Sequence, residues 1–156
     1  MEPRSDLRDV LARAIHERYR QNQQGIKPPD DPAMQPWETL VEHLRESNRQ
    51  QAGDIEATLQ RIGCGVRPAA GPAPAPFSFT DGEVEIMAGV VHEHWMAERE
   101  RAGWVFGPER DVVRKITPYL IPYADLPDAV KEWDRQAVCA IPEVLAAAGL
   151  EVRRLE

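Results

Sequence analysis

The sequence lacks any apolar run near the ~20 residues that a membrane-spanning helix needs, although 42% of its residues are hydrophobic. That share is enough for a buried core in a chain of 156 residues. Asp6 and Asp9 stand where a signal peptide would have its apolar core, so we expect no secretion signal. These absences predict a cytoplasmic protein with no membrane partner.

Cysteine is also scarce, and acidic residues outnumber basic ones by 26 to 19. The two cysteines, Cys64 and Cys139, match no metal or redox spacing, and we expect both as buried, reduced thiols. The formal net charge of −7 argues against a partner that is a nucleic-acid polymer, which a basic surface would bind. It permits a small anionic ligand, because a few well-placed arginines suffice for that.

Motifs of known catalytic or cofactor chemistry are missing as well. No Ser-His-Asp grouping, Cys-His grouping, P-loop or G-x-G-x-x-G motif is visible. The sequence His92-Glu-His94 does not predict a metal site, because residues two apart on a helix point in different directions. We therefore expect a binding protein without a cofactor rather than an enzyme.

What the sequence does contain is a repeat. Residues 36–67 align without a gap with residues 122–153, at a constant offset of 86 (122 − 36). Upstream, the sequence LARAIHERY at 11–19 aligns with MAGVVHEHW at 87–95, at an offset of 76 (87 − 11). We predict a first repeat at 1–67, an extended Pro/Ala-rich linker at 68–76 and a second repeat at 77–156.

Helix starts are predicted from capping patterns. Ser5 is the candidate N-cap of the first helix. In the second repeat, Thr80-Asp-Gly-Glu83 has the form of a capping box. The second helix of each repeat has a candidate box of its own, at Thr39–Glu42 and at Asp125–Asp128.

Helix ends are predicted from glycine and proline. Gly103 should end the first helix of the second repeat, and Gly63 and Gly149 should end the second helix of each repeat before a short extended segment. Pro142 should kink or split its helix. The predicted fold is mainly α: two helix–loop–helix–short-strand repeats, related by a pseudo-two-fold axis, pack as one compact domain with a ligand groove between them.

The second repeat resembles the ryanodine receptor repeat, or RyR domain, family. The resemblance rests on HEHW at 92–95, GWVFG at 103–107, PYLIPY at 118–123 and the helix that ends at Gly149. The first repeat resembles the family through fewer residues, namely His16-Glu17, Trp37, Ser47-Asn-Arg49 and Gly63. The resemblance implies a soluble helical module arranged as a tandem pair, of the kind that bacterial proteins contain.

The resemblance also implies a site. One repeat pair of the family holds an adenine nucleotide, with aromatic rings around the base and arginines near the phosphates. The tryptophan of the family's Gly-Trp motif corresponds to Trp104. In the first repeat Ile26 follows Gly25, so the second face of a base pocket would come from elsewhere.

Two arginines occupy the same position in the two repeats. Arg49 follows Asn48, and Arg135 follows Asp134. Facing a shared groove, the two guanidiniums would clamp a phosphate or carboxylate. The alternative, which we favour, pairs each arginine with the glutamate three positions earlier on its own helix.

The remaining candidates are aromatic or basic. Trp104 stands in a loop after a glycine, where a ring can stack on a base or pack between the repeats. His16 and His92 are aligned by the repeat, and we expect them to form hydrogen bonds within the fold. The full candidate ligand-binding set is Trp104, Arg49, Arg135, Asn48, Arg101, Lys115, Tyr119 and Trp37.

These observations favour a non-catalytic sensor module for an adenine nucleotide or an ADP-ribose-type signal. The alternative is a protein-interaction or assembly module that takes a protein partner and no small-molecule ligand. A small nucleotide hydrolase is a third reading, without a catalytic motif to favour it.

Overall fold

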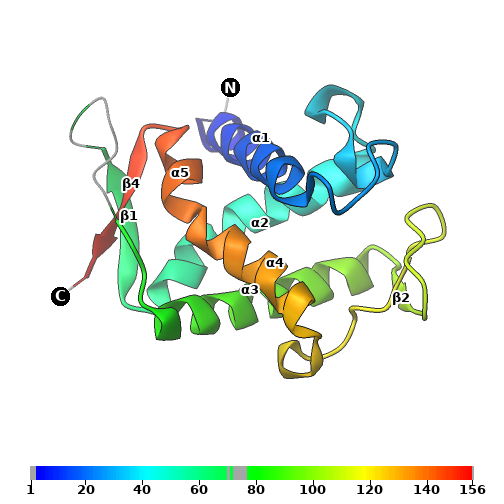
Figure 1. The fold of residues 1–156 in the computed structure, drawn as a ribbon. Coiled ribbons are helices and arrows are strands. Elements are labelled where there is room, and N and C mark those ends of the chain that lie inside the picture. Colours follow the sequence, from blue (N-terminus) through cyan, green and yellow to red (C-terminus); the bar gives the residue numbers. More distant parts are fainter. Residues whose placement is uncertain (1–2, 70, 72–76, 156) are drawn as a thin grey trace.

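The computed structural model describes residues 3–69, 71 and 77–155. The structure is mainly helical, as predicted, and its helices enclose a common interior (Figure 1). The α-helices are α1 (Pro3–Gln23), α2 (Glu42–Gln60), α3 (Asp81–Arg101), α4 (Asp128–Cys139) and α5 (Ile141–Ala146). Short 3₁₀ helices lie at Pro32–Met34, Trp37–Thr39 and Tyr123–Asp125.

The capping box predicted for α3 is confirmed. The Thr80 hydroxyl accepts a hydrogen bond from the Glu83 backbone N–H at 3.1 Å. The Glu83 carboxylate in turn accepts one from the Thr80 N–H at 2.9 Å. Two backbone donors that the helix itself cannot satisfy are therefore paired.

The other predicted helix starts are wrong. Helix α1 begins at Pro3, so Ser5 lies inside the helix. Helices α2 and α4 follow Val41 and Pro127, and neither residue has a side chain that accepts a capping hydrogen bond. The Thr39 and Asp125 positions fall in 3₁₀ helices instead, because the chain makes an extra turn before each long helix.

Replacing Thr80 by alanine should lower the free energy of unfolding by about 1 kcal/mol, because an N-cap hydroxyl contributes about that much. Thr39→Ala is the matched control, since Thr39 caps no α-helix and is exposed. Urea unfolding of both variants measures the difference. Equal costs would contradict the capping role of Thr80.

Glycines end the helices where the sequence predicted. Gly63, Gly103 and Gly149 have φ angles of 74°, 91° and 73°, in the left-handed region that a residue with a Cβ rarely adopts. Pro142 breaks its helix as predicted: α4 ends at Cys139 and α5 begins at Ile141. Together α4 and α5 span the positions that the repeat aligns with α2.

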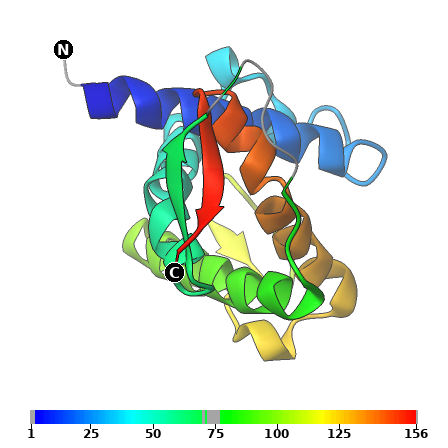
Figure 2. The ribbon, with the colours of Figure 1, turned by 90° about the vertical axis from the view of Figure 1, so that its left-hand side faces the viewer.

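The short extended segments after these glycines pair with each other. Strands β1 (Cys64–Pro68) and β4 (Leu150–Arg154) form an antiparallel ribbon with Val66 opposite Val152 (Figure 2). Pro68, which we had assigned to the linker, is the last residue of β1. The rest of the predicted linker falls largely on residues 70 and 72–76, which lie outside the described residues.

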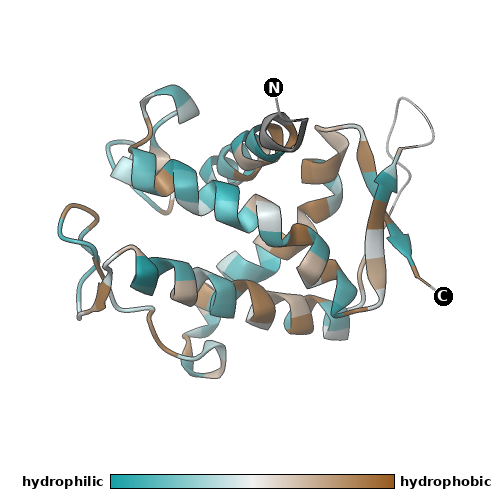
Figure 3. Ribbon diagram, turned by 180° about the vertical axis from the view of Figure 1, so that it is seen from behind, coloured by the Kyte–Doolittle hydropathy of each residue, from teal (hydrophilic) through white to brown (hydrophobic). Residues whose placement is uncertain are grey.

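A second small sheet lies in the loop that follows α3. Strands β2 (Val105–Phe106) and β3 (Ile116–Thr117) are parallel. This loop occupies the ten extra residues (86 − 76) that the second half of the chain carries relative to the first. Figure 3 shows a hydrophobic stretch at its tip.

One hydrophobic core serves both halves of the chain. Ala12 and Leu59 from the first half, and Met87, Val138 and Leu145 from the second, are at most 1% exposed and belong to the same cluster. Cys64 is buried in this core, as predicted. Cys139 is exposed, so the prediction of two buried thiols is wrong for it: the residue occupies the solvent-facing side of the last turn of α4.

A cavity between the two halves

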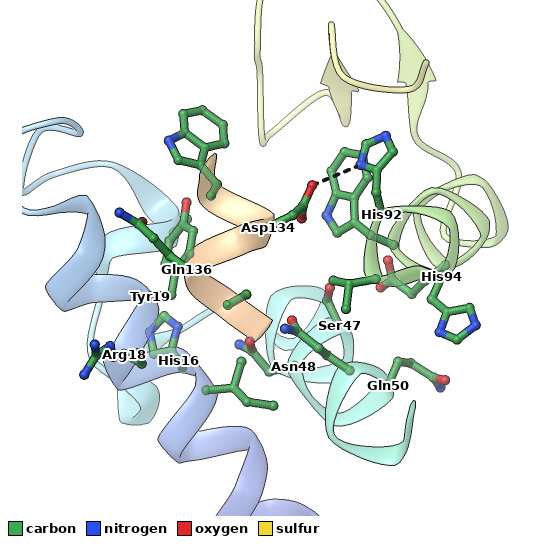
Figure 4. A pocket seen from close by; sticks show the side chains of 18 of the residues that line it. His16, Arg18, Tyr19, Ser47, Asn48, Gln50, His92, His94, Asp134 and Gln136 are labelled. Atoms are coloured by element: carbon green, nitrogen blue, oxygen red, sulfur yellow. Dashed lines mark ion pairs between the residues drawn. The ribbon is translucent and has the colours of Figure 1, made fainter. Parts of the chain in front are cut away.

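A cavity of about 230 Å³ lies between the helices of the two halves (Figure 4). Its wall includes His16 and Tyr19 from α1, Asn48 from α2, His92 from α3 and Asp134 from α4. Each long helix therefore contributes side chains, and the cavity exists only because both halves pack together.

Most positions of the wall occur as pairs that the sequence repeat aligns. At some pairs the residue type is the same or similar, and at others the second half has a larger ring or a charge. The pairs include Ile15/Val91, His16/His92, Tyr19/Trp95, Gln23/Arg99, Leu44/Val130, Ser47/Trp133, Asn48/Asp134, Gln50/Gln136 and Ile55/Ile141.

The two aligned histidines form hydrogen bonds within the fold, as predicted. His16 Nε2 lies 2.6 Å from the carbonyl oxygen of Gln35, and His92 Nε2 lies 2.7 Å from that of Ile121. A carbonyl oxygen only accepts, so each Nε2 carries the proton. Burial lowers the pKa of both imidazoles, which favours their neutral form.

A guanidinium stacks between two tryptophans at the cavity. The Arg99 guanidinium carbon lies 5.2 Å from the Trp95 ring centroid and 5.0 Å from that of Trp104, within cation–π distance of both. Glu98 pairs with Arg99 at 3.0 Å, and both side chains are almost fully buried. Burial lowers the pKa of Arg99.

Lys27 is a second cation against aromatic rings. Its ammonium lies 4.7 Å from the Tyr19 ring centroid and 5.0 Å from that of Trp133, and it donates a hydrogen bond to the Tyr19 hydroxyl. Burial, together with the nearby charge of Arg110, lowers the pKa of Lys27 to about 8. Arg110 itself is held by both carboxylate oxygens of Asp31, at 2.6 and 3.2 Å.

Several buried polar atoms of the wall have no partner within the part of the chain that the structure describes. They are Trp104 Nε1, Gln23 Oε1, Gln136 Oε1, Arg18 Nε and His94 Nδ1. Gln23 is 1% exposed and Trp104 is 6% exposed. Because an unpaired buried polar atom costs free energy, these positions favour a ligand or water that supplies the missing hydrogen bonds.

Three of the candidate residues from the sequence line the cavity. Trp104 packs in the core and also borders the cavity, so the packing role and the ligand-stacking role concern the same position of this ring. Asn48 donates to the Leu44 carbonyl oxygen at 3.1 Å. Tyr119 stands edge-on to Trp133, with ring centroids 5.4 Å apart.

Arg49 and Arg135 lie outside the cavity wall, each held by carboxylates. The predicted pairs with the glutamates three positions earlier are present, at 3.3 and 3.5 Å. The arginine clamp on a shared groove therefore does not form, because both guanidiniums are already satisfied. Their further partners are Asp9 and Glu42 for Arg49, and Glu85 and Asp128 for Arg135.

The other three candidates are also outside the wall. Arg101 is exposed at the end of α3, and Lys115 donates to the Ala102 carbonyl oxygen at 2.8 Å. Trp37 is buried beneath the guanidiniums of Arg45 and Arg49, each 5.7 Å from its ring. It packs in the hydrophobic core.

Sequence reasoning missed Arg99 and Lys27 as cations of the site. Arg99 follows Trp95 by four positions, the spacing at which helix residues touch, so that pair was detectable. No local pattern marks Lys27, since it meets Trp133 from a different segment. Trp95 and Trp133 also border the cavity.

Two further features concern metals and membranes. Within residues 3–69, 71 and 77–155, no three His, Cys, Asp or Glu side chains gather as metal ligands would. His92 and His94 face different carboxylates, those of Asp134 and Asp54, as helix residues two apart point in different directions. None of the helices described is long and apolar enough to cross a membrane.

Comparison with protein families identifies the second half of the chain. Residues 80–154 match the model of the family described as the RyR domain. The matched segment contains α3, α4, α5 and β4, and with them Arg99, Trp104 and Asp134 of the cavity wall. The similarity to the RyR domain family is therefore shown for residues 80–154 of the chain.

Proposed function

We propose that the chain is a non-catalytic RyR-type module that binds an adenine nucleotide or an ADP-ribose-type ligand in the cavity between its halves. The observation that carries the proposal is the set of partly buried cations against aromatic rings at this cavity. We further propose that it acts in the cytoplasm, where two free cysteines stay reduced.

We also infer that the two halves are RyR-like repeats related by a pseudo-two-fold axis. Contacts recur at the aligned positions: His16 with Gln35 matches His92 with Ile121, at offsets of 76 and 86. The carboxylate clusters around Arg49 and Arg135 match in the same way. In the ribbon, Val66 lies opposite its own aligned residue, Val152.

The charges of the cavity favour an anion. The wall has four cations, Arg18, Lys27, Arg99 and Arg110, and three carboxyl groups, those of Asp54, Glu98 and Asp134. The local excess of positive charge attracts phosphate, and exclusion of water strengthens that attraction. Neighbouring rings offer faces on which a base can stack, for about 1–3 kcal/mol.

Wild-type protein should gain thermal stability from ADP-ribose, because a ligand that binds only the folded state stabilises it. Arg99→Gln should weaken binding roughly tenfold or more, since a charge-assisted contact contributes about 1.5–3 kcal/mol. This variant installs the residue that the first half has at the aligned position, Gln23. Calorimetric titration measures the affinity.

Arg101→Gln is the matched control, since it removes an exposed arginine two residues further along the chain. It should leave the affinity unchanged. No thermal stabilisation of wild-type protein by AMP, ATP or ADP-ribose at millimolar concentration would refute the proposal.

One observation favours the second candidate, a protein-interaction module. Val105, Phe106 and Val113 in the loop after α3 are 56%, 62% and 88% exposed. Exposed apolar side chains so close together are typical of interaction sites. The ligand titration separates the two functions, because a module of this kind gains no stability from nucleotides.

A further inference from the structure

Asp134 places a carboxyl group in the cavity wall without a hydrogen-bond partner. Its side chain is 19% exposed and projects from α4 toward α3 (Figure 4). Across the described residues, no donor reaches the carboxyl within hydrogen-bond distance. The nearest polar contact is His92 Nδ1 at 3.6 Å, which is too long for a hydrogen bond.

The tautomer of His92 determines whether the contact between its Nδ1 and the Asp134 carboxyl favours a proton on the carboxyl. Nε2 carries the imidazole proton because it donates to the Ile121 carbonyl oxygen. Neutral His92 therefore turns an unprotonated Nδ1 toward the Asp134 carboxyl. Two acceptors that face each other repel, and a proton on Asp134 removes the repulsion. Burial acts in the same direction and raises the pKa of Asp134 to about 7.

The first half has a neutral group at the aligned position. Asn48 lines the same cavity and donates to a backbone carbonyl of its own helix. A protonated carboxyl is similar to an amide in shape and in having both a donor and an acceptor. The cavity is thus built to hold an uncharged group at both positions.

We propose that Asp134 contacts the ligand and does so as the neutral acid, so that ionisation of this one side chain weakens the binding of an anion. The inference rests on the proposed function. A neutral Asp134 offers an O–H donor inside a cavity that also holds cations. An ionised Asp134 offers a negative charge to a negatively charged ligand and withdraws the donor.

Other ionisable groups border the cavity from each surrounding element. Helix α1 contributes His16, Arg18 and Tyr19, α2 contributes Asp54, and α3 contributes His94, Glu98 and Arg99 besides His92. Lys27, Arg110 and Tyr119 come from loops. Lys27 requires a control, because its pKa of about 8 places its loss of charge in the same pH range.

The test is the affinity for ADP-ribose between roughly pH 6.5 and 8.5, in a Lys27→Arg background that keeps a cation at residue 27 throughout. ADP-ribose is the probe because its pyrophosphate lacks the second ionisation near pH ~6 that a phosphate monoester has. With Asp134 present, the dissociation constant should rise about tenfold over this range, because binding takes up a proton. With Asp134→Asn it should change less than about threefold.

Asn48→Asp is the matched variant. It adds a carboxyl at the aligned position and should make the pH dependence steeper. Equal pH profiles with Asp134 and with Asp134→Asn would overturn the inference and leave the ligand site standing. Absence of binding at every pH would remove both. A carboxyl ¹³C signal of Asp134 in the free protein that titrates near pH ~4, the ordinary value, would overturn the inference alone.

Discussion

Asp134→Asn is expected to stabilise the free protein at pH 8, by about 2–4 kcal/mol. The pKa of Asp134 is about 7 in the folded state, because the carboxyl is buried. In the unfolded chain an aspartate titrates near ~3.9. Each pKa unit between the folded and the unfolded state corresponds to about 1.4 kcal/mol of stability. The upper end of the range assumes the full difference between the two pKa values.

The direction of the pH dependence of stability follows from proton binding. The folded state holds the proton of Asp134 more tightly than the unfolded state does. This contribution is fully present below about pH 3.9 and is lost as the pH rises to about 7. An asparagine has no proton to lose, so wild-type and variant stabilities should be similar at pH 4 and separate toward pH 8.

Urea unfolding at a series of pH values measures this difference. An asparagine already occupies the aligned position of the first half, where Asn48 Nδ2 donates a hydrogen bond to the Leu44 carbonyl oxygen one turn earlier. Asp125→Asn, at an exposed position, is the control and should leave the pH profile unchanged. If Asp134→Asn and wild type kept a constant difference from pH 4 to pH 8, the carboxyl would not be protonated in the folded protein.

Leu59→Ala and Leu145→Ala should each destabilise the protein by about 3 kcal/mol, because a buried leucine truncated to alanine leaves a cavity. The two leucines are aligned by the repeat, 0% and 1% exposed, and belong to the same core cluster. Since that core draws on both halves, each variant should still unfold in a single transition.

Urea unfolding followed by tryptophan fluorescence and by circular dichroism tests both points. Val113→Ala is the control: its side chain is 88% exposed, and truncation should change the stability by less than about 0.5 kcal/mol. Two separate transitions, or probes that disagree about the midpoint in either leucine variant, would show that the halves fold independently.

Local features of this fold were predictable from the sequence. The Thr80 box, the glycines at 63, 103 and 149, and the break at Pro142 all depend on residues within one or two turns of each other. Backbone conformation at such positions is set by steric and hydrogen-bonding preferences that act over a few residues. The same locality explains the i,i+3 ion pairs of Arg49 and Arg135.

Predictions failed where the outcome depended on distant segments. Ser5, Thr39 and Asp125 had suitable side chains for caps, but the chain starts its helices earlier or makes another turn first. Cys139 is exposed because its side of α4 faces away from the core. A side chain's own chemistry cannot show which face of its helix another segment will cover.

The sequence by itself determined the helical class, most helix ends, the family of residues 80–154 and the alignment of the two halves, because each follows from local order along the chain. Only the tertiary structure decided which side chains meet at the cavity. Lys27 and Arg110 reach it from loops, and Asp134 is largely buried there. Burial is a property of the packed molecule, and it lowers the pKa of Lys27 and raises that of Asp134.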